Sequence, residues 1–282
     1  MSNINLTWDV DGVPESFNVY RSTSPISIDN MPPPIATEVS DNTYVDEAIV
    51  EGVTYFYRVA SLKGETYKVS AEISVSAEAG DEYFESVNFL IFADGTSIVD
   101  SSDNSKTVSN TSVTLVDSSV IAPKYDDKSM YFNGSAYLTV AHDALGTSDF
   151  TLEAFVRISS GTSWSPIFES TGISLMKRTE TAMTRLLLSV NSVNIFVSDT
   201  VYITNNTWQH VCVMRKSGQF YLYVDGVSSG KNTAQNTFAL AGTAFKIMSG
   251  LVGYMNSIRL TKGVARYDTS GFTQPGEKFK AF

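Results

Sequence analysis

Residues 206–227, "NTWQHVCVMRKSGQFYLYVDGV", decide the fold class. Two runs of alternating side chains are separated by Arg215-Lys216-Ser217-Gly218, and the second run ends at Asp225-Gly226. Alternation with a period of two is the pattern of a β-strand, and Gly-containing breaks of this kind are typical of hairpin turns. The stretch therefore predicts a hairpin in the middle of a sheet.

The same stretch contains one of the two His residues and the only Cys of the chain, His210 and Cys212. In a strand these two side chains point to the same face, about 6–7 Å apart along the backbone. A thiolate–imidazole pair needs hydrogen-bond reach, which is shorter than this spacing. We interpret both residues as structural and expect no catalytic role for them.

Strand-length runs continue along the whole chain, and no apolar period of 3.6 residues is sustained anywhere. Residues 1–78 contain short strands with Gly, Pro and Asp turns, and "MPPP" at 31–34 marks an edge or a crossover loop. From residue 84 onward there are about ten strand-like runs, while 107–119, "TVSNTSVTLVDSS", is expected to be loop-rich. So many runs suit a jelly-roll sandwich of two large sheets. The fold class is predicted to be all-β.

The motifs "LTW", "FNVYRS", "EGVTYFYRVAS" and "SAEISVSA" make residues 1–78 similar to a fibronectin type III domain. Trp8 stands at the position of that family's core Trp, and Tyr55 at its tyrosine-corner position. The resemblance implies a β-sandwich. The small and polar residues 79–83 are expected to be a short linker.

A second resemblance covers residues 84–282. "SMYFNGSAYLTV", "DFTLEAFVRIS", "TWQHVCVMRKSGQFYLYVDG" and "GYMNSIRLTKGVARY" occur in the order found in laminin G-like, concanavalin A-like domains. The closing "IRLTKGVARY", followed by "FTQPGEKF", is similar to the version found in tailed-phage virion proteins. The resemblance implies a concanavalin A-like jelly roll on a phage particle.

Composition and charge exclude several classes of protein. A single Cys excludes an internal disulfide. Residues 1–78 hold 12 acidic and 4 basic side chains, a balance of −8 within a total of −10, and no dense basic face exists for nucleic acid. "MSNINLTWDV" lacks the features of a secretion signal, and no apolar run approaches the roughly 18 residues of a membrane helix. We expect neither nucleic-acid binding nor membrane insertion.

Catalytic motifs find little support. Two His and one Cys, with His142 far from His210 in sequence, are too few for a zinc site. "GTSWS" at 161–165 lacks the final Gly of a serine hydrolase elbow, and no phosphate loop or dinucleotide fingerprint occurs. Glycoside hydrolysis needs two facing carboxylates, whereas Glu153 and Glu169 are each a lone acid on a strand. We predict no catalytic residues and no enzyme.

Calcium remains a possible ligand, because some laminin G-like domains bind it at a rim. The candidate carboxylates lie in turn-like stretches and are Asp94, Asp100, Asp103, Asp126 and Asp127. That family often has acidic residues just before its last strand, where this chain has Asn256-Ser257. Turn chemistry is the favoured interpretation of these aspartates, so no metal site or cofactor is predicted.

Carbohydrate binding would use aromatic rings on loops, and Trp164 and Tyr202 are the candidates; the alternative is that they close the ends of the sandwich. A locally basic run near the end of the chain is either a docking surface or a scattered solvated face. It consists of Arg259, Lys262, Arg266, Lys278 and Lys280.

The resemblances together predict a non-enzymatic surface protein of a tailed-phage virion, made in the host cytoplasm. It would be a capsid decoration or tail-accessory component, present in many copies, that contacts other virion proteins and displays an adhesion domain. Two alternatives remain open. One is a carbohydrate-binding adhesin of the tail that recognises host glycans, and the other is a glycan-cleaving enzyme.

Overall fold

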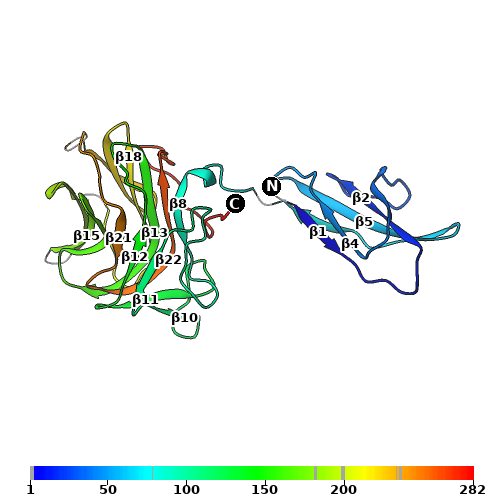
Figure 1. Cartoon of the computed structure of the whole chain (residues 1–282), viewed down its shortest axis with the longest axis horizontal. Helices are drawn as coiled ribbons and strands as arrows, with labels where there is room; N and C mark the ends of the chain where they lie inside the picture. Colours follow the sequence, from blue (N-terminus) through cyan, green and yellow to red (C-terminus); the bar gives the residue numbers. More distant parts are fainter. Residues whose placement is uncertain (1–2, 78, 181–182, 198–200, 233, 235–236) are drawn as a thin grey trace. The chain divides into compact units, whose positions relative to one another are not determined.

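The computed structural model describes residues 3–77, 79–180, 183–197, 201–232, 234 and 237–282. The chain divides into two compact units, residues 1–81 together with Phe282, and residues 82–281 (Figure 1). The expected linker, 79–83, spans this division, and residue 78 lies outside the described residues. Phe282 groups with the first unit because its carbonyl oxygen accepts a 2.7 Å hydrogen bond from the Asp81 N–H. No helix among the described residues is long and apolar enough to cross a membrane.

The described residues of the first unit form seven strands. They are β1 (Ile4–Thr7), β2 (Ser16–Ser22), β3 (Pro34–Val39), β4 (Thr43–Asp46), β5 (Thr54–Lys63), β6 (Thr66–Val69) and β7 (Ile73–Ser76). Strands β1 and β4 pair with each other, while β3-β2-β5-β6 form a second sheet in which β7 also pairs with β5. Pro34 begins β3, an edge strand, which is one of the two alternatives for "MPPP"; an edge tolerates the missing N–H of proline.

The core of the first unit contains the two aromatic residues singled out from the sequence. Trp8 is partly buried and meets Phe17 edge to face, with ring centroids 5.2 Å apart. Tyr55 is buried, and its hydroxyl accepts a 2.8 Å hydrogen bond from the Val50 N–H, five residues upstream. Both residues therefore contribute to packing in this unit.

The second unit has two antiparallel sheets. One is an eight-stranded sheet in the order β10-β11-β22-β13-β18-β19-β20, with β8 also paired to β22; the other has seven strands in the order β17-β16-β15-β14-β21-β12-β9. A short 3-10 helix, η1 (Phe84–Ser86), precedes the first strand. The strands are β8 (Val87–Ile91), β9 (Val108–Thr111), β10 (Thr114–Val116), β11 (Ser129–Asn133), β12 (Tyr137–Ala141), β13 (Phe150–Gly161), β14 (Ser165–Ser170), β15 (Ile173–Glu180), β16 (Met183–Val190), β17 (Val193–Val197), β18 (Gln209–Lys216), β19 (Gln219–Val224), β20 (Val227–Asn232), β21 (Ala244–Ile247) and β22 (Leu251–Lys262).

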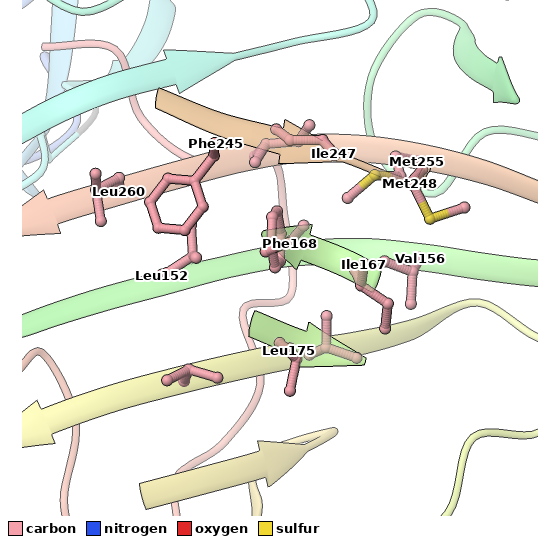
Figure 2. Close-up of a cluster of buried hydrophobic side chains, with 14 of the residues drawn as sticks. Leu152, Val156, Ile167, Phe168, Leu175, Phe245, Ile247, Met248, Met255 and Leu260 are labelled. Carbon is pink, nitrogen blue, oxygen red and sulfur yellow. The ribbon is translucent and has the colours of Figure 1, made fainter. Parts of the chain in front are cut away.

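A single core lies between the two sheets (Figure 2). Along β13 every second side chain, from Phe150 to Ile158, enters it, so alternation alone makes that strand contribute one face to the core. Figure 2 shows side chains of both sheets meeting there, with Leu152, Val156, Met255 and Leu260 from the eight-stranded sheet and Ile167, Phe168, Leu175, Phe245 and Ile247 from the seven-stranded sheet. The all-β prediction with a concanavalin A-like jelly roll is confirmed.

The predicted hairpin at 209–224 is also confirmed. β18 and β19 pair in register from Val211↔Val224 to Lys216↔Gln219. The turn residues Ser217 and Gly218 have φ of 50° and 77°, and Asp225 and Gly226 repeat this geometry before β20. Two successive positive φ angles match the right-handed twist of paired strands, which is why Gly occupies the second turn position each time.

Four strands lie where the sequence pattern indicated none. β9 and β10 fall within 107–119, which was expected to be loop-rich, and β15 and β20 were not predicted. β9, β10 and β20 are edge strands, where polar side chains face solvent and obscure the alternation. β15 is internal, but its second half carries Lys177 and Arg178 in place of apolar residues.

Candidate functional site

A buried polar network lies on the outer face of the eight-stranded sheet. Glu153 on β13 is fully buried, and its Oε1 accepts hydrogen bonds from Nε and Nη2 of Arg259 on β22, at 2.9 and 2.8 Å. Its Oε2 lies 2.9 Å from Nε2 of His210 on β18 and accepts a 2.6 Å hydrogen bond from the Tyr267 hydroxyl. The strand register brings these groups together, because Glu153 is the cross-strand partner of Arg259 and of Cys212.

The electrostatics of this network keep Glu153 ionised. Burial alone would raise the pKa of its carboxyl, but the Arg259 guanidinium and the His210 ring hold that pKa well below its usual range. Burial and the nearby carboxylate raise the pKa of Cys212. A thiol that stays protonated is a poor nucleophile. Glu153 is thus an ion-paired structural group, and Cys212 packs as a small apolar residue.

The C-terminal segment, residues 264–281, contributes the side chains that cover this network. Phe279 lies over Arg259, with the guanidinium carbon 4.1 Å from the ring centroid, and its ring is 5.6 Å from that of Phe155. Phe272 stacks on Tyr267 at 3.6 Å and packs beside Cys212. The pair singled out in the sequence, His210 and Cys212, therefore lies beneath a second layer of protein.

The basic run near the end of the chain is largely used inside this unit. Arg259 binds Glu153, Arg266 donates to the Thr261 hydroxyl, and Lys278 pairs with Asp94 at 2.7 Å. Lys280 lies 3.4 Å from Glu277. These contacts make the run part of the attachment of the C-terminal segment.

The candidate calcium carboxylates accept hydrogen bonds from nearby protein groups. Asp126 is buried, and it accepts from the Ala93 N–H and from the N–H and hydroxyl of Ser257; burial raises the pKa of Asp126. Asp94 accepts from the Asp127 N–H, and Asp100 from the N–H groups of Leu90, Ser102 and Lys106. Asp103 and Asp127 are exposed.

Asn256 also fixes the loop of residues 124–128 that contains Asp126, since its side chain forms hydrogen bonds with the backbone of Lys124, Tyr125 and Lys128. Across the residues that the structure describes, no three His, Cys, Asp or Glu side chains are grouped to hold a metal.

His142, the second histidine, lies near the seven-stranded sheet. Its ring stacks on Phe245 with centroids 4.4 Å apart, and its two nitrogens meet the Asp143 carbonyl at 2.9 Å and the Ser170 hydroxyl at 3.2 Å. Burial lowers the pKa of His142. The ring therefore acts as a neutral packing group, remote in the strand order from His210.

The outer face of the seven-stranded sheet carries a continuous row of polar side chains, one from each strand. Successive cross-strand partners define this polar row as Ser109, Thr139, Lys246, Glu169, Ser174, Ser189 and Asn194. Their chain neighbours, such as Leu138, Val140, Phe245 and Ile247, enter the core, so the row points away from it. At about 4.8 Å per strand, the row is roughly 29 Å long.

Sequence reasoning missed the polar row except for Glu169. Most members are single polar residues between apolar ones, which indicates a strand but gives no partner. The row can be recognised only when the pairing register of the seven strands is known. Lys246 also lies over the ring of Tyr137, with Nζ 4.1 Å from the centroid, so an aromatic ring borders the row.

Trp164 and Tyr202, the candidate sugar platforms, lie level with each other on this sheet, because each contacts one member of a cross-strand pair of arginines. Trp164 is 49% exposed and lies against Arg178 on β15, and Tyr202 is 36% exposed and lies against Arg185 on β16. Arg178 and Arg185 are cross-strand partners. The structure thus joins two residues, 38 positions apart in the sequence, through a pair of arginines.

Comparisons with known proteins agree with this architecture. A family model described as the concanavalin A-like lectin/glucanases superfamily matches residues 132–254. No protein with a curated description matches the chain.

Similar solved structures include domain 4 of AbnA, an extracellular arabinanase from Geobacillus stearothermophilus, in complex with arabinotriose, at 14% identity and a TM-score of 0.48 over 64% of this chain and 93% of that one. The binding domain of botulinum neurotoxin DC, in complex with SialylT, is 13% identical with a TM-score of 0.47 over 64% of this chain and 49% of that one. A Trypanosoma rangeli sialidase is 12% identical with a TM-score of 0.49, over 84% of this chain and 45% of the sialidase.

The family match lies within the second unit and takes in strands of both its sheets. The second unit therefore has a concanavalin A-like β-sandwich fold, and its residues 132–254 are similar to the lectin/glucanase family of that fold.

Proposed function

We propose that this protein is a non-enzymatic attachment protein, whose jelly-roll domain binds glycans on the outer face of its seven-stranded sheet. The observation that carries the proposal is the polar row, in which seven strands each contribute one hydrogen-bonding side chain. Sugars present hydroxyls along their edges and apolar C–H faces, so they suit a strip of polar groups bordered by aromatic rings. Tyr137 is such a ring, and Trp164 and Tyr202 lie farther along the same face, against Arg178 and Arg185.

Two members of the row support this function in particular. Glu169 and Asn194 are exposed, so their carboxylate and amide are accessible to the hydroxyls of a sugar. The Ser174 hydroxyl between them is buried and, within the described residues, has no hydrogen-bond partner.

The chemistry of the row supports binding without cleavage. Glycoside hydrolysis usually employs two carboxylates about 5–9.5 Å apart. The polar row contains hydroxyls, an amide, the Lys246 ammonium and the single carboxylate of Glu169. Glu153, the other acid considered from the sequence, is fixed on the opposite sheet by its buried ion pair with Arg259 and its contact with His210.

The test is a binding screen of the purified protein against a broad glycan panel, with Trp164→Ala and Asn194→Ala as variants. Saturable binding that both variants weaken, with no reducing ends released from the bound polysaccharide, supports the proposal. A matched control is Tyr131→Ala, which removes a ring from the outer face of the eight-stranded sheet. Release of reducing ends would establish an enzyme, and an absence of binding across the panel would overturn the glycan-binding function.

The cellular setting is the second part of the proposal. We propose that the chain lies on the surface of a tailed-phage particle, in many copies, attached to other virion proteins. Support comes from the resemblance of residues 1–78 to fibronectin type III domains and of the "IRLTKGVARY" region to phage virion proteins. Many copies would multiply weak single sites into firm attachment.

Gold-labelled antibody against this chain on purified particles tests the setting. Label over the head shell indicates a capsid decoration protein, and label on the tail indicates a tail component or an adhesin. Unlabelled particles, with the protein present in infected cells, would contradict a place on the virion.

A further inference from the structure

Four side chains form a second row on the outer face of the seven-stranded sheet, defined here as the arginine row: Trp164, Arg178, Arg185 and Tyr202. Arg178 and Arg185 are direct cross-strand partners on β15 and β16, so their side chains leave the same face of the sheet about 5 Å apart at Cβ. The guanidinium carbon of Arg178 is 5.2 Å from the Trp164 ring centroid, and that of Arg185 is 5.7 Å from the Tyr202 ring centroid.

Backbone hydrogen bonds place both rings level with the arginines. The Trp164 N–H donates to the Lys177 carbonyl, next to Arg178, and the Ile203 N–H donates to the Thr184 carbonyl, next to Arg185. The order across the face is therefore ring, cation, cation, ring. At the usual strand spacing the two rings are about 14 Å apart, with the arginines between them.

Trp164 is held in this place at a cost. Its φ is 74°, a region that a bulky side chain rarely adopts. Two hydrogen bonds from neighbouring side chains fix the turn, between the hydroxyls of Thr162 and Ser165 at 2.9 Å, and from the Thr179 N–H to the Ser163 hydroxyl at 3.1 Å. A strained backbone that presents a half-exposed indole is an observation that points to a binding role.

The chemistry of the arginine row selects its ligand. A guanidinium is planar and presents its N–H groups in a fork that matches a carboxylate. A ring under the cation leaves the N–H groups directed in the plane, and also offers an apolar surface to a sugar ring. The whole chain carries a formal charge of −10, which disfavours anions at long range, so an anion that binds here does so through these short-range contacts.

We propose that the arginine row binds glycans whose sugars carry a carboxylate, with the acid group at Arg178 and Arg185 and the sugar faces on Trp164 and Tyr202. The inference rests on the proposed glycan-binding function, and it names the class of glycan.

The test compares each acidic polysaccharide with its own methyl ester, in which the backbone is unchanged and the carboxylate charge is absent. Polygalacturonate, alginate, hyaluronate and polysialic acid form the panel, and dextran sulfate represents polyanions without carboxylates. At least one carboxylated polymer is expected to bind ten times or more tightly than its ester and than dextran sulfate. Arg178→Gln and Arg185→Gln should each remove that preference while leaving the weaker binding of the ester.

Arg157→Gln is the matched control. Arg157 also lies over a tyrosine ring, 5.9 Å from the centroid of Tyr254, but on the eight-stranded sheet. This variant should leave the preference intact, and unfolding curves of all three variants verify that they fold.

Equal affinity for acid and ester in every pair, with Trp164→Ala still abolishing binding, would overturn the inference and leave the proposed function standing. Tightest binding to dextran sulfate would replace it with general polyanion binding. If neither charged nor neutral glycans bind, the proposed function fails as well.

Discussion

The eight-stranded and the seven-stranded sheet share one core but differ in what covers their outer faces. On the eight-stranded sheet, Glu153, His210 and Arg259 are buried beneath residues contributed by the C-terminal segment. On the seven-stranded sheet, Glu169 and Asn194 of the polar row are exposed, and Trp164 is half-exposed. Polar residues in one set are bonded to each other, whereas Glu169 and Asn194 in the other are exposed to solvent. In this fold, the cover of a face decides whether its polar side chains are buried in mutual contacts or exposed.

The largest expected effect is on the covered face. Replacing Glu153 by Ala leaves the Arg259 guanidinium buried without its carboxylate, and breaking a buried ion pair in this way costs about 3–5 kcal/mol of unfolding free energy. Glu169→Ala, on the open sheet, should change it by less than about 0.5 kcal/mol. Urea unfolding of both variants measures the difference. Equal losses would mean that the two faces do not differ as described.

A smaller effect should follow from loosening the cover itself. Phe272→Ala removes a ring that stacks on Tyr267 and packs beside Cys212, and since Phe272 is half-buried we expect a loss of about 2 kcal/mol. Cys212 is the only thiol and is fully buried, so it reports opening directly. Labelling by a thiol reagent under native conditions should become faster in this variant. Labelling of the unchanged protein at the same rate would show that the segment does not protect this face.

On the open face, a substitution should improve stability and impair binding. Trp164→Gly removes the strain of a φ of 74°, which is worth about 1 kcal/mol when glycine replaces a side chain at such an angle. We expect a higher melting temperature than that of Trp164→Ala, with glycan binding lost in both variants. If the Gly variant were less stable than the Ala variant, the backbone at Trp164 would not be strained, and strain would no longer support a binding role for the arginine row.

The smallest effect concerns pH and the second histidine. Burial lowers the pKa of His142 in the folded protein below its unfolded value, so the folded state favours the neutral ring. Its contribution to stability is complete above the unfolded pKa, near 6.5, and is lost as the pH falls below it. The drop in unfolding free energy between pH 7 and pH 5 should therefore be smaller in His142→Gln than in the unchanged protein. An identical drop would assign the acid sensitivity to other groups.

The sequence was sufficient for the parts of this molecule in which local pattern and structure coincide. The alternation around His210 and the Gly-containing turns predicted the β18–β19 hairpin, because both signals are local. Polar edge strands such as β9 and β20 were missed. An edge strand pairs on one side only and exposes many side chains to solvent, so its sequence shows little apolar alternation.

The candidate site depended on register. Trp164 and Tyr202 were identified as ring candidates, but Arg178 and Arg185 were not, because only the pairing of β15 with β16 brings the four together. In the same way, Glu153 was expected to be a lone acid. Its partners on β18, on β22 and in the C-terminal segment are distant in sequence, and only strand pairing and the cover place them around it.

The central position of β22 has a consequence for how the chain is made. This strand, residues 251–262, pairs with β8, β11 and β13, the last of which ends at Gly161, so its direct partners are synthesised long before it. While the ribosome is still translating residues 84–250, the inner faces of those strands lack their central partner, and contacts across such a sequence separation form slowly. The second domain is thus expected to fold only after β22 has emerged from the exit tunnel. A chain arrested before that point would expose strand edges and be prone to aggregate.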